Sequence, residues 1–106
     1  MKPFLTCDDA MGNHSPVLAP SDYVLAVHLA PDTPRTIAIP PDARIVLFSA
    51  TGPFWARFAA PATVPATDIL DGTAPELNPA GRSVFGIGQL GLAAATACIV
   101  NLVFYG

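Results

Sequence analysis

"SVFGIGQLGLAAATACIVNLVFYG", residues Ser83–Gly106, closes the sequence without a single charged side chain. A stretch of this length and composition is consistent with a membrane-spanning helix, a buried helix or strands of a sheet. Its first half contains Gly86, Gly88 and Gly91, which weaken a helix. Its last part, "CIVNLVFY", is β-branched and aromatic, and its alternate residues make one wholly apolar face. The pattern favours two paired strands joined around Ala94-Ala95, buried on both faces in a core or against a neighbouring subunit.

Twelve prolines divide the rest of the chain into short segments. Proline fixes φ and lacks a backbone donor, so it breaks helix interiors and central strands. The intervening segments are too short for ordinary helices but suit strands. The sequence therefore predicts an all-β fold, an antiparallel β-sandwich of jelly-roll-like or barrel-like form, as a single domain over residues 21–106. Residues 1–20 are rich in turn formers and are predicted to form an extended N-terminal arm.

Alternation locates the predicted strands within the domain. Residues 21–30, "SDYVLAVHLA", place four apolar side chains on one face, namely Tyr23, Leu25, Val27 and Leu29. A short strand, "RTIAI", follows at residues 35–39 between two proline-containing turns. Residues 44–60, "RIVLFSATGPFWARFAA", contain two β-rich runs separated by Gly52 and Pro53. This stretch is predicted to be a hairpin.

The segment from Ala60 to Arg82 has no period that indicates a strand or a helix. A loop of this length in a compact domain is usually functional or packed as an Ω-type excursion. Asp71-Gly72 and Asn78-Pro79 are turn signals inside it. Its three carboxylates are of the type that binds calcium, but their spacing matches no calcium-binding loop, so turns are expected instead.

Charge argues against nucleic acid and for protein partners. The net charge is −3, and the five basic residues are scattered singly, whereas nucleic-acid binding needs several phosphate contacts on one face. Only 12% of the residues are charged and 52% are hydrophobic. So few charges leave apolar patches on the surface, and we expect a partner to cover part of it.

No motif in the sequence indicates catalysis, a cofactor or a metal. His14 and His28 lack companions at a metal-binding spacing, and no serine lies in a nucleophile motif. Gly86, Gly88 and Gly91 match the dinucleotide-binding spacing, but no acidic residue follows them. With two cysteines there is no disulfide framework, and Cys98 is expected to be a small buried apolar residue. The start "MKPFLTCDDA" has no apolar run and is not predicted to be a secretory signal.

Residues 43–106 resemble small structural proteins of tailed bacteriophages in the order of their features. A hairpin reads "IVLFSATGPFWARF", a loop reads "VPATDILDGTAPELNPAGR", a strand reads "GQLGLAA", and the last strand, "CIVNLVFYG", ends in aromatics. The resemblance implies a β-sandwich that assembles on the capsid or at the head–tail region, often as a trimer. It implies a non-enzymatic capsid decoration (cement) protein, located in the virion, whose partners are the major capsid protein or other virion proteins and further copies of itself.

We expect the arm, the hairpin and the long loop to supply the subunit contacts. The residues predicted to make them are apolar or cationic: Phe4, Leu5, Trp55, Arg57, Leu70 and Leu77. The alternative function is a tail- or head–tail-associated module that binds carbohydrate or a receptor, with Trp55 as a stacking platform for a sugar ring. A membrane protein anchored by residues 83–106 is the least favoured reading.

Overall fold

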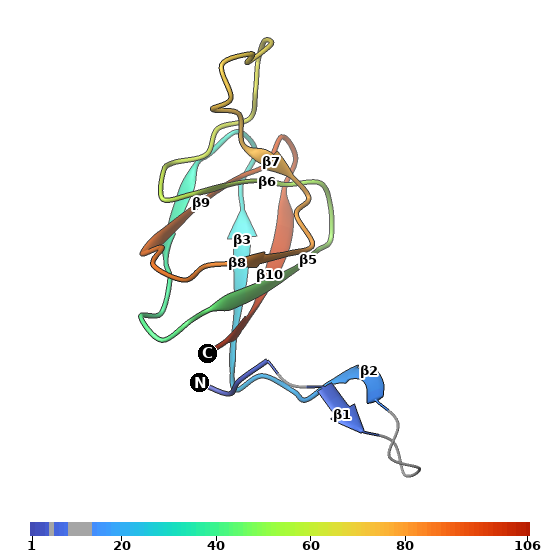
Figure 1. Cartoon of the computed structure of the whole chain (residues 1–106). Coiled ribbons are helices and arrows are strands. Elements are labelled where there is room, and N and C mark those ends of the chain that lie inside the picture. Colours follow the sequence, from blue (N-terminus) through green and yellow to red (C-terminus); the bar gives the residue numbers. More distant parts are fainter. Residues whose placement is uncertain (5, 9–13) are drawn as a thin grey trace.

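The computed structural model describes residues 1–4, 6–8 and 14–106, and side-chain environments for residues 1–4 and 18–106 (Figure 1). The described residues contain strands and no helix. In chain order the strands are β1 (Thr6–Asp8), β2 (His14–Leu18), β3 (Tyr23–Leu29), β4 (Arg35–Ala38), β5 (Ile45–Ala50), β6 (Trp55–Phe58), β7 (Glu76–Leu77), β8 (Gly81–Ser83), β9 (Gln89–Ala93) and β10 (Cys98–Tyr105). The all-β prediction is confirmed, and the two helical alternatives for the closing stretch are wrong.

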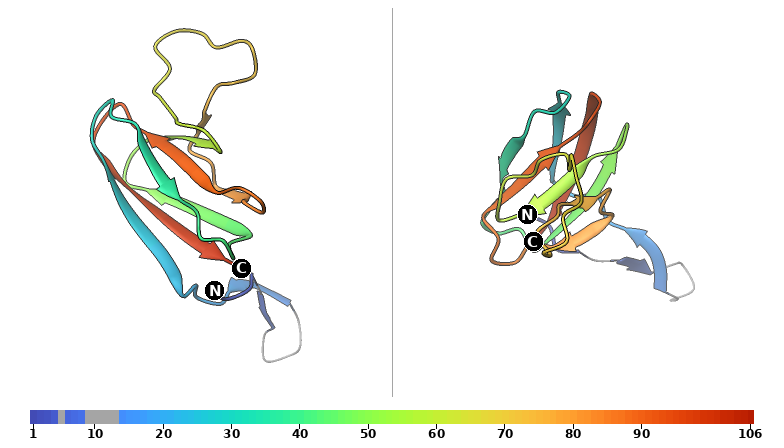
Figure 2. Two further views of the ribbon diagram at one scale, coloured as in Figure 1. Left: turned by 90° about the vertical axis from the view of Figure 1, so that its left-hand side faces the viewer. Right: turned by 90° about the horizontal axis from the view of Figure 1, so that it is seen from above.

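Eight strands form two antiparallel sheets of four, which lie as two layers (Figures 1 and 2). Sheet I has the order β3-β10-β5-β8, and sheet II has the order β4-β9-β6-β7. The last two strands occupy inner positions: β10 pairs with β3 and β5, and β9 pairs with β4 and β6. The arrangement is sandwich-like, with both ends of the chain contributing to sheet I.

One apolar cluster lies between the sheets and holds them together. Alternation along β3 and β10 directs their side chains as the sequence predicts, with Val27 and Leu29 buried opposite Val100 and Cys98. Each such buried aliphatic or aromatic side chain contributes about 1.5–3 kcal/mol. Sheet I contributes Val27, Leu29, Val46, Phe48, Cys98, Val100, Leu102 and Phe104, and sheet II contributes Ala56, Leu90 and Leu92. Cys98 is a buried free thiol, as expected.

The predicted hairpin over residues 44–60 is wrong. Its two strands, β5 and β6, belong to different sheets. The chain stays with β10 through Thr51, whose amide donates to the Ile99 carbonyl and whose hydroxyl accepts from the Ile99 amide. It then crosses to sheet II, where the Asn78 side chain accepts from the Phe54 amide. The connection is a corner between the layers because both strands have their hydrogen-bonding partners elsewhere.

The closing stretch also differs from the predicted pair of hydrogen-bonded strands. Residues 84–88 form a turn in which Gly86 adopts a positive φ of 78°. The two strands that follow, β9 and β10, lie in opposite sheets and do not pair with each other. Each is nevertheless flanked by strands on both sides, which accounts for the lack of charge in this part of the sequence.

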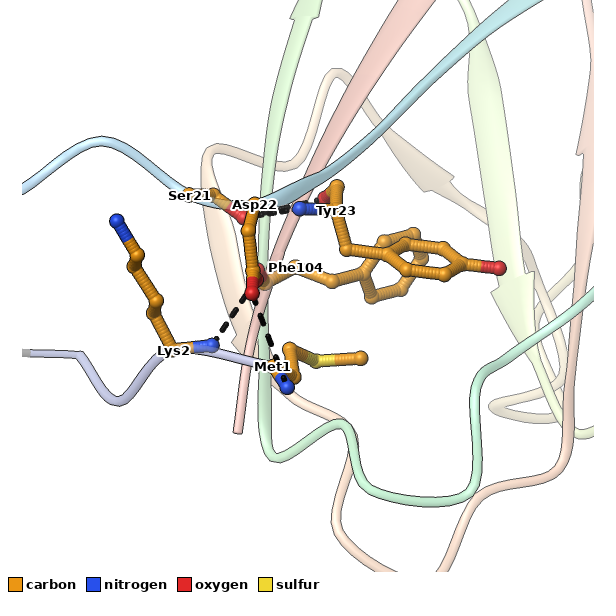
Figure 3. A network of polar contacts seen from close by, with 6 residues as sticks. All are labelled: Met1, Lys2, Ser21, Asp22, Tyr23 and Phe104. Atoms are coloured by element: carbon orange, nitrogen blue, oxygen red, sulfur yellow. Dashed lines mark hydrogen bonds and ion pairs between the residues drawn. The ribbon is translucent and has the colours of Figure 1, made fainter.

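The beginning and the end of the chain are fastened together beside β3 (Figure 3). The Gly106 amide donates to the Lys2 carbonyl at 2.8 Å. The Lys2 amide donates to the Asp22 carboxylate at 3.0 Å, and the N-terminal ammonium lies 3.9 Å from the same carboxylate. The Ser21 hydroxyl donates to the Phe104 carbonyl. In the sequence between Lys2 and Ser21, strands β1 and β2 pair in a separate two-stranded sheet. That residues 1–20 act as one extended arm stays a prediction.

Candidate functional site

The long loop begins by covering the outer face of sheet II. Residues 60–62 run across β9, and Ala62 is 1% exposed. At Gly91 the backbone of the loop lies so close that a Cβ atom would stand 2.5 Å from the Ala60 carbonyl oxygen. A side chain at position 91 would therefore displace the loop. Gly91, which the sequence presents as part of a nucleotide-binding spacing, serves this close approach.

The middle of the loop extends away from both sheets, at the end of the domain remote from the chain termini (Figures 1 and 2). Residues 66–74 are all exposed, and Leu70 is 91% exposed at its tip. Ile69 beside it is also exposed, and Asp68 and Asp71 flank the two apolar side chains. Leu70, held this far from the core, contributes little to folding and is free to contact another molecule, and Ile69 at 36% exposure adds to the same apolar surface.

A turn shapes the tip. The Asp71 carboxylate accepts from the Thr73 hydroxyl at 2.6 Å and from the Thr73 amide at 3.1 Å. The Thr73 hydroxyl, followed by its amide, holds the pKa of Asp71 below 3.8, and the nearby charge of Arg57 acts in the same direction. Gly72 adopts a positive φ of 86°. The turn predicted at Asp71-Gly72 is confirmed.

Three of the predicted contact residues lie together on the outer face of sheet II. Trp55 and Arg57 alternate with the buried Ala56, so both point outward and are half-buried. Leu77 of β7 is the cross-strand partner of Trp55 and is 52% exposed. We call Trp55, Arg57 and Leu77 the Trp55 face. With the loop tip it forms the candidate contact surface.

Phe4 lies elsewhere. It is 39% exposed and packs edge-on against Tyr105, with the ring centroids 5.3 Å apart. Tyr105 in turn donates its hydroxyl to the Ala19 carbonyl. Phe4 therefore borders the joined termini rather than the loop, and Leu5 lies outside the described residues.

Sequence reasoning missed the outer face of sheet I. Val24, Val103 and Leu47 are successive cross-strand partners on β3, β10 and β5, and they form an apolar row across the sheet. Val24 is 51% exposed, and Ile99 on the same face of β10 is 37% exposed. Within the single chain, the closing strand is thus fully buried on one face only. The signal was present in the sequence, because many outward positions of these strands are apolar, although His28, Ser49 and Asn101 are polar.

One surface depression lies at the corner where the chain crosses between the sheets. An open depression of about 430 Å³ lies between the end of β5 and the start of β6, and its lining is uncharged: Phe48, Ser49, Ala50, Gly52, Pro53, Phe54, Asn78, Pro79 and Ala80. Over residues 1–4, 6–8 and 14–106 there is no group of three metal-ligating side chains and no helix able to cross a membrane.

No family model, curated protein or solved structure matches the chain.

Proposed function

We propose that this chain is a non-enzymatic structural protein of a tailed-bacteriophage virion, a decoration or cement protein that binds the capsid and stabilises it. The observation that carries the proposal is the order of the strands. In the proposed fold, sheets I and II form a β-sandwich of the jelly-roll type, whose eight strands are divided four and four between two facing sheets. Jelly rolls are frequent among viral capsid and lectin domains.

The strand order supports this fold in detail. Each sequential pair from β3 onward is divided between the layers: β3 with β4, β5 with β6, β7 with β8, and β9 with β10. Sheet I is ordered β3-β10-β5-β8 and sheet II β4-β9-β6-β7, so each of the two sheets places its strands in corresponding positions. Two interlocked Greek keys produce this order.

The loop tip is the proposed capsid contact. Its exposed Ile69 and Leu70 form an apolar patch of the kind that marks protein–protein contact sites. The Trp55 face continues this surface at the base of the loop. The low charge of the chain, 12%, suits a surface that is largely covered in the assembled particle. The proposed partner is the major capsid protein or another virion protein.

Removing the protein from the particle tests the proposal. Particles assembled without the chain should release their genome at a lower temperature and under milder osmotic shock than complete particles. Adding the purified chain back should restore both tolerances. Particles whose stability is the same with and without the chain would contradict the cement function.

A second function, carbohydrate or receptor binding, is favoured by the position of Trp55. Its half-buried ring lies on an outer sheet face that also carries Arg57, whose guanidinium is a donor for sugar hydroxyls. Lectin domains share the proposed fold. Binding on a glycan array that is lost in Trp55→Ala, in a variant that unfolds at the wild-type temperature, would establish this function. Absence of any glycan signal for the wild-type chain would remove it.

A further inference from the structure

The four sheet edges differ in how well they are protected against pairing with another chain. Exposed edges are usually blunted by short strands, charges or prolines. The edge strands β8, β7 and β4 have three, two and four residues, and each carries a charged side chain: Arg82, Glu76 and Arg35. The fourth edge, β3, has seven residues, "YVLAVHL", without charge or proline. Its register with β10 is unbroken, so no bulge disturbs it.

The hydrogen-bonding groups on the free side of β3 can be identified from its neighbour. The Ile99 amide and carbonyl are both bonded to Thr51, so in β10 this residue and every second one after it face β5. The alternate residues of β10 face β3 and pair with the residues of β3 that face β10. These pairs are Cys98 with Leu29, Val100 with Val27, Leu102 with Leu25, and Phe104 with Tyr23. The backbone groups of Val24, Ala26 and His28 therefore point away from the sheet.

One of these outward-pointing backbone groups already has a hydrogen-bond partner. The His28 carbonyl accepts from the Arg35 side chain at 3.0 Å. Among the described residues, no strand pairs with this edge of β3. Val24, Ala26 and His28 are all exposed, and β3 forms the margin of its sheet in Figure 2. The edge is a preformed template for one more strand.

We propose that this template is filled by β3 of a second copy of the chain, in an antiparallel pair whose two-fold axis passes midway between the two Ala26 residues. This register pairs all three outward-facing residues: Ala26 faces its own copy, and Val24 faces His28 of the other copy. The His28 carbonyl, which accepts from Arg35, has a second lone pair for the partner. Both members of each pair exchange N–H···O bonds. The two copies of sheet I then form one continuous sheet of eight strands.

The side chains favour a second copy over an unrelated peptide. On the inner face, this register places Leu25 against the partner's Val27 and Tyr23 against the partner's Leu29. Tyr23 faces the core and packs on Phe104, yet it remains 41% exposed in the single chain. Pairing covers this side chain with apolar surface, and the uncharged strand brings no like charges together. The inference is independent of the proposed function, because it concerns two copies of the chain in solution.

Proline scanning of the edges tests the proposal. The wild-type chain should have twice the monomer mass in sedimentation velocity, and Ala26→Pro should halve it, because proline removes an outward N–H that only the dimer uses. Ala38→Pro is the matched control: Ala38 is also an exposed alanine on an edge strand, and its neighbour Ile39 donates to Gly88, so its own N–H points outward. Ala38→Pro should remain dimeric.

Paired charges at exposed positions test the register without a backbone change. Val24→Glu with His28→Glu brings like charges together across the two-fold axis and should give monomers. Val24→Lys with His28→Glu brings opposite charges together and should retain the dimer. A wild-type chain that is monomeric or trimeric at all concentrations, an Ala26→Pro variant that remains dimeric, or two charge variants with the same mass would each overturn the proposal.

Discussion

Ala62 lies directly over Gly91, so close that a Cβ on residue 91 would stand 2.4 Å from the Ala62 nitrogen. Real Cβ contacts are never this short, and the obstacle is backbone, which cannot rotate away. Gly91→Ala should therefore destabilise the fold by about 3 kcal/mol, the upper end of ordinary overpacking. Gly88→Ala, in the preceding turn, meets no atom within 4 Å and is the control. Urea unfolding of the two variants checks the contrast; equal midpoints would show that the loop does not rest on β9.

The contact of Asp22 with the start of the chain should appear in the pH dependence of stability. The Lys2 amide, with a smaller contribution from the N-terminal ammonium, holds the pKa of Asp22 below 3.8. A carboxylate with a depressed pKa stabilises the fold above its unfolded pKa, and this contribution disappears as the pH falls through the folded pKa. The wild type should unfold at a higher temperature than Asp22→Asn at neutral pH, and the two should converge in acid.

Asp68→Asn provides the comparison for that experiment, because it removes the same charge from the exposed loop. At neutral pH its melting temperature should lie closer to that of the wild type than the melting temperature of Asp22→Asn does, because it loses no contact with the start of the chain. A constant difference between wild type and Asp22→Asn over the whole acid range would mean that the Lys2–Asp22 contact does not form in solution.

A substitution at the loop tip should weaken binding to the particle without changing the stability of the fold. Leu70→Ser removes an apolar side chain that is 91% exposed, so the free energy of unfolding should change by less than about 0.5 kcal/mol. Occupancy of the chain on reconstituted particles should nevertheless fall at least about tenfold, the effect of losing one interface anchor. Phe85→Ser is the matched control, since Phe85 is 72% exposed in the turn between β8 and β9. Loss of occupancy in both variants alike would rule out a specific role for the tip.

Arg82 and Glu76 form an ion pair that joins the edge strand of sheet I to the edge strand of sheet II. Two guanidinium nitrogens lie 3.0 and 2.9 Å from one Glu76 carboxylate oxygen, and both side chains are about 42–43% exposed. A double-mutant cycle with Arg82→Met and Glu76→Gln should give a coupling of about 0.5 kcal/mol in low salt. Because the pair is exposed, the coupling should decrease in about 1 M salt. A coupling that salt leaves unchanged would contradict this assignment.

Alternation in the sequence was sufficient to predict which side chains face the core. The inward positions of β3 and β10 are as expected, and so are the turns at Asp71-Gly72 and Asn78-Pro79, where Asn78 adopts a positive φ of 47°. Alternation carries no information about hydrogen-bonding partners, however. A short connection such as Thr51–Pro53 fits both a hairpin and a corner between layers, and the choice depends on Ile99 and Asn78, which are remote in sequence.

Only part of the candidate surface could be predicted, because strand pairing decides which residues share a face. Trp55, Arg57 and Leu77 meet on one face only because β7 pairs with β6, and that pairing is not visible in the sequence. The exposure of Leu70 was predictable, since no periodic pattern connects it to a core. The open edge of β3 was not, because the sequence cannot distinguish an edge strand without charges from an inner strand.

The inner positions of β9 and β10 have a consequence for the order of folding on the ribosome. Until they are synthesised, β3 has no link to β5 in sheet I and β4 has no link to β6 in sheet II. Every hydrogen-bonded pair that closes the sheets is therefore distant along the chain, which slows folding. The nascent polypeptide carries β3 and β4 unpaired until β9 and β10 emerge, so chaperone binding should be strongest just before residues 89–106 leave the ribosome.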